Sequence, residues 1–143
     1  MPLKENYKSD PTRCISQPFV VAGCLIKKNN KFLLVEENGK YNFPQGWIKL
    51  GEKLDCGAKR ETEEETGLEV KITSMQGIYT LIKKKKNKTL HKIKVIYNAN
   101  LTGRKKRNSD NLKIEWMSEK EIKNNLRKMW DIDMLNIIKN NND

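Results

Sequence analysis

The stretch Gly46-Trp-Ile-Lys-Leu-Gly-Glu-Lys-Leu-Asp-Cys-Gly-Ala-Lys-Arg-Glu-Thr-Glu-Glu-Glu-Thr-Gly-Leu68 is the most informative part of this sequence. Its first part, residues 46–51, begins and ends with glycine and is expected to be a loop, in which the backbone can approach a ligand closely. Its second part, residues 54–66, is expected to form a helix. The helix should end at Gly67, because glycine readily adopts the left-handed conformation that closes many helices.

Three glutamates of the expected helix carry its chemical signal. Successive helical residues are rotated by about 100°, so Glu61, Glu64 and Glu65 fall on one stripe, where like charges repel. The stripe is therefore either a solvated face or a site that a hard divalent cation neutralises. Oxygen ligands alone favour Mg²⁺, Mn²⁺ or Ca²⁺ over zinc. Arg60, at the edge of the stripe, can hold one carboxylate in place, whereas Glu63 points away and is expected at the surface.

The spacing in this stretch resembles the signature of the Nudix (MutT-like) hydrolase family, G-x5-E-x7-R-E-U-x-E-E-x-G-U, in which U is apolar. The fixed positions are filled by Gly46, Glu52, Arg60, Glu61, Glu64, Glu65 and Gly67, and Leu68 fills the last apolar site. The one departure is Thr62 at the first apolar site, a mild change because its methyl group can still pack. The resemblance extends over roughly residues 18–122.

The resemblance implies an α+β fold, an α/β/α sandwich with a mixed central sheet and a loop-helix-loop catalytic motif. It implies Mg²⁺ as cofactor, with Mn²⁺ as a substitute. Glu64 and Glu65 are expected as the principal metal ligands, together with the backbone carbonyl of Gly46. The remaining roles follow the motif: Glu61 as a further ligand or the base that activates water, Arg60 as the group that orients it, and Glu52 as a support for the site through water or Arg60.

A further acidic residue and four weaker substrate contacts complete the expected site. Many family members place an acid six positions before a tryptophan that ends a strand, and here Asp110 precedes Trp116 by six. Aspartate is shorter than the more usual glutamate, so Asp110 is either part of the site or an ordinary loop carboxylate. The candidate substrate contacts are Trp47, Tyr41, Phe43 and Lys49, for which packing or solvent exposure is the alternative.

The rest of the chain predicts a single strand-rich domain, residues 18–143, after an irregular arm, residues 1–17. Apolar runs and turn signals predict strands at residues 19–26, 31–36, 69–73, 77–83, 90–101 and 112–117. Ser118 and Glu121 form a capping box that should open a C-terminal helix. Helical spacing of apolar residues is expected to continue that helix to Trp130, which should pack inside.

Composition limits the classes of protein that this chain can belong to. Of its 143 residues 36% are hydrophobic and 33% charged, and no apolar run approaches the roughly 20 residues that span a bilayer. Three cysteines without a zinc pattern and an N-terminus without a signal core suggest reduced thiols and a cytoplasmic protein with no membrane association. Nothing in the sequence indicates an oligomeric state.

The net charge of +11 leaves two functions open. The basic runs, residues 83–88 and 104–107, are expected at turns, either as solvated loop tips or as contacts to RNA phosphates. The first hypothesis is hydrolysis of a diphosphate linkage in a small nucleotide, such as a nucleoside di- or triphosphate. The alternative is removal of pyrophosphate or a cap from the 5′ end of RNA. A nucleotide-binding module without catalysis is a third reading, which the complete carboxylate set disfavours.

Overall fold

The computed structural model describes residues 17–107, 110, 112–131 and 133–141, so the expected N-terminal arm lies almost entirely outside the described residues. Its strands are β1 (Phe19–Leu25), β2 (Lys27–Lys28), β3 (Lys31–Glu37), β4 (Lys40–Asn42), β5 (Gln45–Trp47), β6 (Leu68–Lys85), β7 (Lys88–Lys105) and β8 (Lys113–Ser118). Its helices are α2 (Leu54–Thr66), α3 (Glu119–Asn124), a 3-10 turn (Leu126–Lys128) and α4 (Met134–Asn141).

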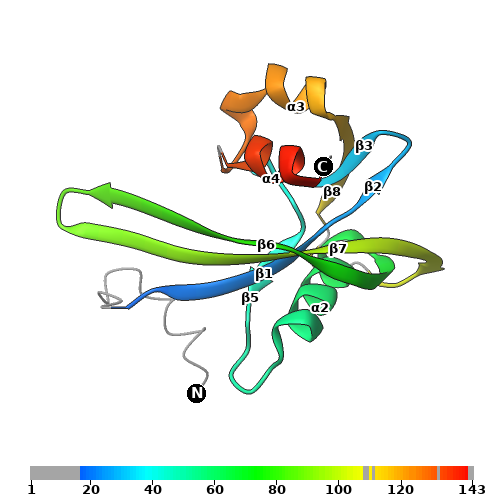
Figure 1. The fold of residues 1–143 in the computed structure, drawn as a ribbon, viewed down its shortest axis with the longest axis horizontal. Coiled ribbons are helices and arrows are strands. Elements are labelled where there is room, and N and C mark those ends of the chain that lie inside the picture. The colour runs from blue at the N-terminus through cyan, green and yellow to red at the C-terminus, as the bar shows by residue number, and fades with distance from the viewer. Residues whose placement is uncertain (1–16, 108–109, 111, 132, 142–143) are drawn as a thin grey trace.

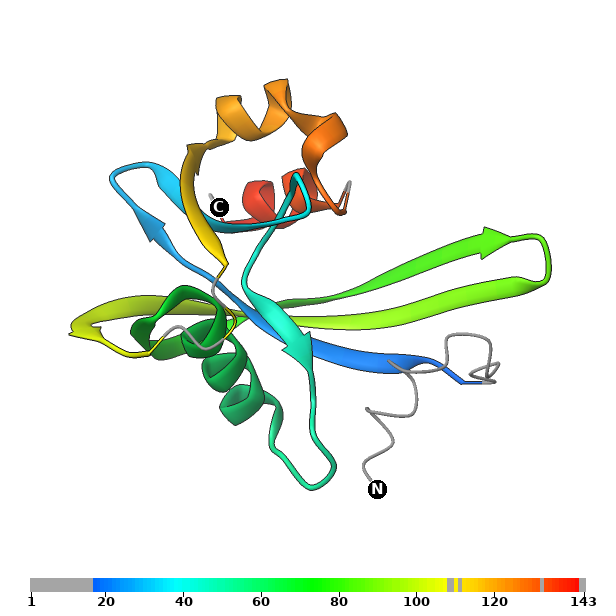
Figure 2. The ribbon, with the colours of Figure 1, turned by 180° about the vertical axis from the view of Figure 1, so that it is seen from behind.

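A mixed four-stranded sheet forms the centre of the molecule, with strand order β5-β1-β7-β6. Strand β1 runs parallel to β7 and antiparallel to β5, and β6 and β7 form a long antiparallel hairpin. A second sheet joins β2, β3 and β4, and β8 pairs with β3. Helix α2 lies on one side of β1, and α3 and α4 lie on the opposite side (Figures 1 and 2). The expected α+β fold with a mixed sheet and helices on both sides is confirmed.

Helix α2 occupies the expected residues, from Leu54 to Thr66. Gly67 closes it in the left-handed conformation, with φ of 71°, and its N–H donates to the carbonyl of Glu63. Ala58 of this helix packs with Ala22, Cys24 and other small or branched residues of the central sheet. Small side chains on both surfaces allow the helix to lie close to β1, which brings its carboxylate stripe to the sheet edge.

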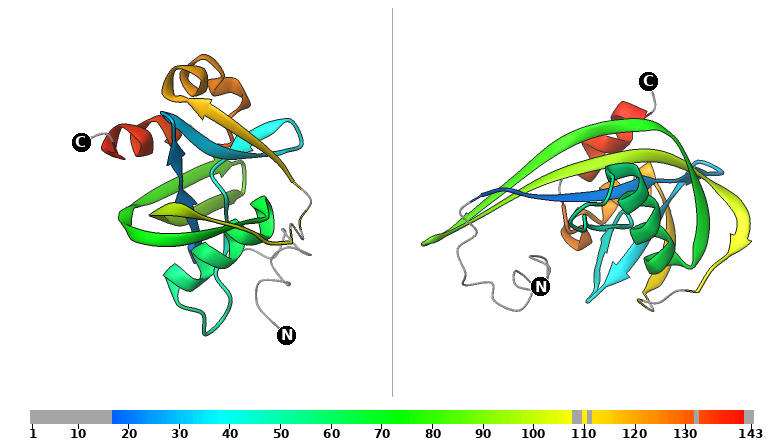
Figure 3. Two further views of the ribbon diagram at one scale, coloured as in Figure 1. Left: turned by 90° about the vertical axis from the view of Figure 1, so that its right-hand side faces the viewer. Right: turned by 90° about the horizontal axis from the view of Figure 1, so that it is seen from below.

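The strand predictions for the central hairpin are wrong in their boundaries. One strand, β6, replaces the two that were expected, because two register shifts near Ile72 and Met75 absorb the interruption at Thr73–Gln76 without breaking the ladder. The hairpin therefore extends far from the body of the molecule (Figure 3). Lys83 to Lys85 and Arg104 and Lys105 lie within strands, so the basic runs are not simple turn tips.

The C-terminal helix is also shorter than expected. Its capping box is present, since Ser118 accepts from the Glu121 N–H and the Glu121 side chain accepts from the Ser118 N–H. The helix then ends at Asn124, and a 3-10 turn follows. Trp130 lies outside any helix and is 41% exposed, because its N–H donates to the Tyr41 carbonyl and holds the chain beside β4. None of the described helices is long and apolar enough to cross a membrane.

Candidate active site

The loop before α2 brings Gly46 against the helix. Gly46 lies opposite Ala22 in the antiparallel pairing of β5 with β1. A β-carbon at this position would collide with the carboxylate of Glu61, whose side chain is buried. Only glycine therefore lets the backbone of β5 lie against this carboxylate.

Arg60 links the acidic residues of the motif through its guanidinium group. Its Nε and Nη2 donate to the two oxygens of Glu52, at 2.6 and 3.0 Å, in a bidentate pair. Its Nη1 donates to Glu61 at 3.1 Å and to Glu64 at 3.2 Å, and its Nη2 also donates to the Trp47 carbonyl. The Arg60 hydrogen bond holds the pKa of Glu52 down at about 2. Arg60 thus positions the loop and two carboxylates together.

Three carboxylates meet at this edge of the sheet. Glu61, Glu64 and Asp110 each offer an oxygen, and these oxygens lie within 4.8 Å of one another. The backbone explains how Asp110 arrives there, since its N–H donates to the carbonyl of Glu64 at 3.2 Å. Although Asp110 has the shorter side chain, the approach of its backbone to α2 places its carboxylate beside the two glutamates.

Glu65 lies apart from this triplet, on the side of the helix that faces β5. Its Oε1 accepts from the Gln45 N–H at 2.9 Å. Burial, aided by the charges of Glu61 and Asp110, raises the pKa of Glu65 to about 8. The carboxyl group is therefore protonated near neutral pH until a positive charge joins it.

This pKa predicts that the metal-free protein loses stability as the pH rises. Between about pH 4.5 and 8 the folded protein keeps a proton on Glu65 that the unfolded chain releases, so the free energy of unfolding falls over this window. Urea denaturation in a chelating buffer at pH 5, 6.5 and 8 measures the decrease. Glu65→Gln should flatten it. An equally steep pH dependence in that variant would contradict the assignment.

Glu63 does not lie at the surface, as the sequence suggested, but is buried. Its Oε2 accepts from the N–H of Val70 at 3.1 Å, and Lys59 and Lys106 approach it at 3.6 and 3.3 Å. The helical stripe correctly turns Glu63 away from Glu61. The chain that returns through β6 then covers it, which periodicity within one helix does not reveal.

We accordingly predict a structural rather than a catalytic effect at this position. Glu63→Ala leaves the N–H of fully buried Val70 without its acceptor, which should lower the free energy of unfolding by about 1–3 kcal/mol. The turnover number of the folded variant should remain within about twofold of wild type. Denaturant titration and steady-state kinetics measure the two quantities. A large loss of turnover without loss of stability would contradict this role.

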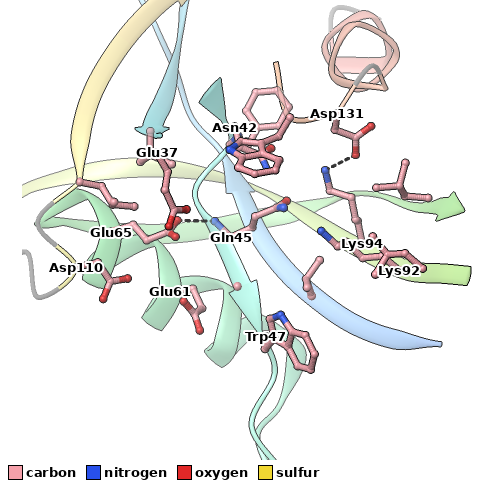
Figure 4. Close-up of a pocket in the computed structure, with 18 of the residues that line it drawn as sticks. Glu37, Asn42, Gln45, Trp47, Glu61, Glu65, Lys92, Lys94, Asp110 and Asp131 are labelled. Carbon is pink, nitrogen blue, oxygen red and sulfur yellow. Dashed lines mark hydrogen bonds and ion pairs between the residues drawn. The ribbon is translucent and has the colours of Figure 1, made fainter. Parts of the chain in front are cut away.

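A cavity of about 590 Å³ opens beside the carboxylates. Glu37, Glu61, Glu65 and Asp110 line one end of it, and Lys92, Lys94 and Asp131 line the other. Figure 4 shows Glu37, Glu61, Glu65 and Asp110 on the left, Lys92, Lys94 and Asp131 on the right, and Gln45 between them. Aromatic side chains complete the wall: Phe43, Trp47 and Trp130. The cavity therefore has an acidic end that can hold a cation, a basic end that can hold an anion, and aromatic walls on which a planar group can pack.

The structure brings some of the expected substrate contacts to the cavity and leaves others outside. Trp47 and Phe43 line it, although Trp47 also stacks on Phe19 at 4.4 Å between ring centroids. Tyr41 packs against a hydrophobic core instead, and Lys49 is exposed outside the lining, with its backbone N–H donating to Glu52.

The lysine end of the cavity was not foreseen from the sequence. Lys92 and Lys94 alternate with Ile93 and Val95 along β7, so polar groups recur on one face of this part of the strand. That alternation was the available signal. Asp131 carried no such signal, because it follows Trp130 in a segment that was expected to be helical.

Comparison with known proteins identifies the family. The NUDIX domain family model matches residues 17–140, nearly the whole chain. The chain is a Nudix hydrolase. Nudix enzymes act on phosphorus-containing anhydrides, and they generally use a divalent metal ion. The family and the class of enzyme expected from the motif are confirmed.

Individual relatives of this Nudix hydrolase are distant. It is 25% identical over 138 residues to a MutT-like protein of Streptomyces ambofaciens, covering 92% of this chain and 86% of that protein. It is 34% identical over 73 residues to an ADP-ribose pyrophosphatase of Methanocaldococcus jannaschii, covering 48% of this chain and 43% of that protein. Its fold resembles the solved NUDIX hydrolase from Nitrosomonas europaea, with a TM-score of 0.75 at 24% identity over 88% of this chain and 89% of the other.

The acidic cluster fits a hard divalent cation. Glu61, Glu64 and Asp110 supply oxygen ligands only, and the close approach of Gly46 to Glu61 adds main-chain groups at the same place. Arg60 is the positive charge that contacts both Glu61 and Glu64 in this structure. One guanidinium shared among three glutamates leaves excess negative charge, which a divalent ion can neutralise.

Proposed function

We propose that this enzyme is a Mg²⁺-dependent pyrophosphohydrolase that cleaves the diphosphate linkage of a nucleoside di- or triphosphate or a related nucleotide. The observation that supports it most directly is the carboxylate cluster of Glu61, Glu64 and Asp110, two of which, Glu61 and Asp110, line one end of the cavity. The cavity volume falls in the range of small-ligand sites, about 300–1,000 Å³. A single nucleotide is of a suitable size for such a space.

Each residue of the motif has a task in this proposal. Glu61, Glu64 and Asp110 hold the cation, with Glu65 as a further ligand once its carboxyl group has lost its proton. Mg²⁺ bound there would polarise the phosphoryl group and lower the pKa of a bound water. Glu61 faces both the cluster and the cavity, so we assign to it the removal of a proton from the attacking water.

Arg60, Glu52 and the loop act by positioning. The bidentate Arg60–Glu52 pair fixes the guanidinium, which in turn holds Glu61 and Glu64 and the Trp47 carbonyl. The contacts of Arg60 with Glu52, Glu61 and Glu64 are hydrogen bonds between charged groups, which are stronger and more directional than neutral ones. The geometry of the carboxylates is therefore set before substrate arrives.

A substrate panel tests the function. Purified protein is incubated with nucleoside di- and triphosphates, ADP-ribose, sugar nucleotides and 5′-triphosphorylated RNA, in Mg²⁺, in Mn²⁺ and in chelator. We expect hydrolysis of a small nucleotide that is abolished by chelator, restored by Mg²⁺ and supported by Mn²⁺. Faster turnover of RNA ends than of every small nucleotide would favour the alternative function. Tight binding of nucleotides without turnover of any compound would indicate a non-catalytic module.

A further inference from the structure

Three lysines share one face of the β6–β7 hairpin at the end of the cavity away from the carboxylates. Lys92 and Lys94 are two residues apart on β7, so their side chains leave the same face of the sheet. Lys83 on β6 pairs with Leu90, and Leu81 pairs with Lys92, so Lys83 is the diagonal neighbour of Lys92 on that face. All three lysines line the cavity, and we refer to them as the lysine wall.

The positive charge of the lysine wall is only partly balanced. Lys94 forms a buried ion pair with Asp131, at 2.7 Å, with both side chains at most 3% exposed. Although burial opposes it, the charge of Lys94 keeps the pKa of Asp131 below its usual value. Within the described part of the chain, neither Lys92 nor Lys83 has a salt bridge. One carboxylate thus faces three ammonium groups.

Of Lys92 and Lys83, the two lysines of the wall that lack a salt bridge among the described residues, Lys92 is the less exposed to solvent. It is half-buried beside the Phe19 ring, whose centroid is 5.9 Å from its Nζ, whereas Lys83 is exposed at the rim. Burial, followed by the charge of Lys94, lowers the pKa of Lys92. A positive charge that is partly removed from water and repelled by its neighbours gains from an anionic ligand.

Gln45 gives an independent indication that a ligand spans the cavity. Its side chain extends from the side of Glu65 toward the side on which Lys92 and Lys94 lie (Figure 4). Its Oε1 is buried and accepts no hydrogen bond from the described residues. A buried acceptor without a hydrogen bond lowers the stability of the fold unless a ligand donates to it. A ribose hydroxyl is a donor of suitable size.

We propose that the lysine wall binds a second phosphate, which the nucleoside part of the substrate carries, while the diphosphate to be cleaved lies at the carboxylates. This inference rests on the proposed function and narrows its substrate class to nucleotides that are also phosphorylated on the ribose. This second phosphate can come from two sources: a terminal ribose phosphate of a small nucleotide, or the first phosphodiester of an RNA chain. A neutral nucleobase would leave two ammonium groups without a counter-charge.

Product-like ligands test the proposal independently of hydrolysis. Calorimetry compares adenosine and guanosine 5′-monophosphate with their 2′,5′- and 3′,5′-bisphosphates and with the dinucleotides pApA and pGpG. None of these contains a diphosphate linkage, so binding is measured without turnover. At least one bisphosphate or dinucleotide should bind about tenfold more tightly than the corresponding monophosphate. This is the effect expected for a hydrogen-bonded charge pair. A bisphosphate preference alone indicates a small nucleotide, and an equal gain for the dinucleotide indicates an RNA end.

Lys92→Met is the decisive variant, because it removes the half-buried charge and breaks no salt bridge. It should reduce the tenfold preference to less than about threefold. Lys84→Met is the matched control, since Lys84 is adjacent to Lys83 but exposed and outside the cavity lining. It should retain the full preference. Thermal unfolding checks that both variants are folded.

Two results would overturn the inference: equal affinities of wild type for mono- and bisphosphates and dinucleotides, or an undiminished preference in Lys92→Met. Failure of the proposed function is a separate result, because it appears as no hydrolysis of any diphosphate compound in the substrate panel. A protein that hydrolyses small nucleotides but shows no preference for the second phosphate keeps its function and loses only this inference.

Discussion

Glu64→Gln should reduce turnover at saturating Mg²⁺ by at least about 10²-fold, the scale expected for a group directed at charge in the transition state. Glu64 belongs to the carboxylate cluster with Glu61 and Asp110 and contacts Arg60 at 3.2 Å. Glutamine preserves the volume of the side chain and removes its charge, so the loss of turnover measures the contribution of the negative charge. Glu61→Gln should have an effect of similar size.

The controls for this prediction separate metal chemistry from general surface charge. Glu115→Gln removes an exposed carboxylate on β8 that has no salt bridge among the described residues, and it should leave turnover unchanged. Asp110→Asn should cost at least about tenfold, because the structure places its oxygen in the same cluster. Equal turnover of Glu64→Gln and Glu115→Gln, with both proteins folded by thermal unfolding, would refute the assignment of the cluster.

Gly46→Ala should lower turnover by about 10²-fold while the protein stays folded. The added methyl group collides with the carboxylate of Glu61, which Arg60 and the surrounding residues hold in place. Either β5 or Glu61 must move, and a displacement of about 1 Å at a catalytic group costs on this order. Steady-state kinetics and thermal unfolding of the variant measure the two effects.

Gly39→Ala is the comparison for the glycine prediction. A β-carbon there meets nothing within 4 Å, but the backbone has φ of 79°, where alanine is strained. The control should therefore lose about 1 kcal/mol of stability without loss of turnover. Full activity of Gly46→Ala would show that the approach of β5 to Glu61 does not matter for catalysis.

The local pattern of the sequence was sufficient for the helix and its carboxylates. Helix α2 and its closure by Gly67 follow from propensity and from the conformational freedom of glycine, both of which act within a few residues. The same holds for the capping box that opens α3. The spacing of the motif was sufficient to identify the family. Positions along one helix follow from the helical repeat, which local spacing also determines.

Contacts between distant segments decided what the pattern could not. Glu63 lies on the expected face of α2, yet β6 and Lys106 cover it, so exposure depended on the chain that packs there. Trp130 was expected inside a helix, but its hydrogen bond to Tyr41 holds it in a bend. In both cases the competing interaction comes from residues that are not neighbours in the sequence.

By itself, the sequence determined the family, the catalytic helix and the neighbouring positions of Glu61 and Glu64 on it, because these depend on residue types at fixed local spacing. Only the tertiary structure decided that Asp110 reaches Glu61 and Glu64, and that Lys92 and Lys94 line the same cavity as Glu61 and Asp110. The pairing of β1 with β7 and the docking of α2 bring these residues together. Such long-range approach depends on the packing of whole elements, which local periodicity does not encode.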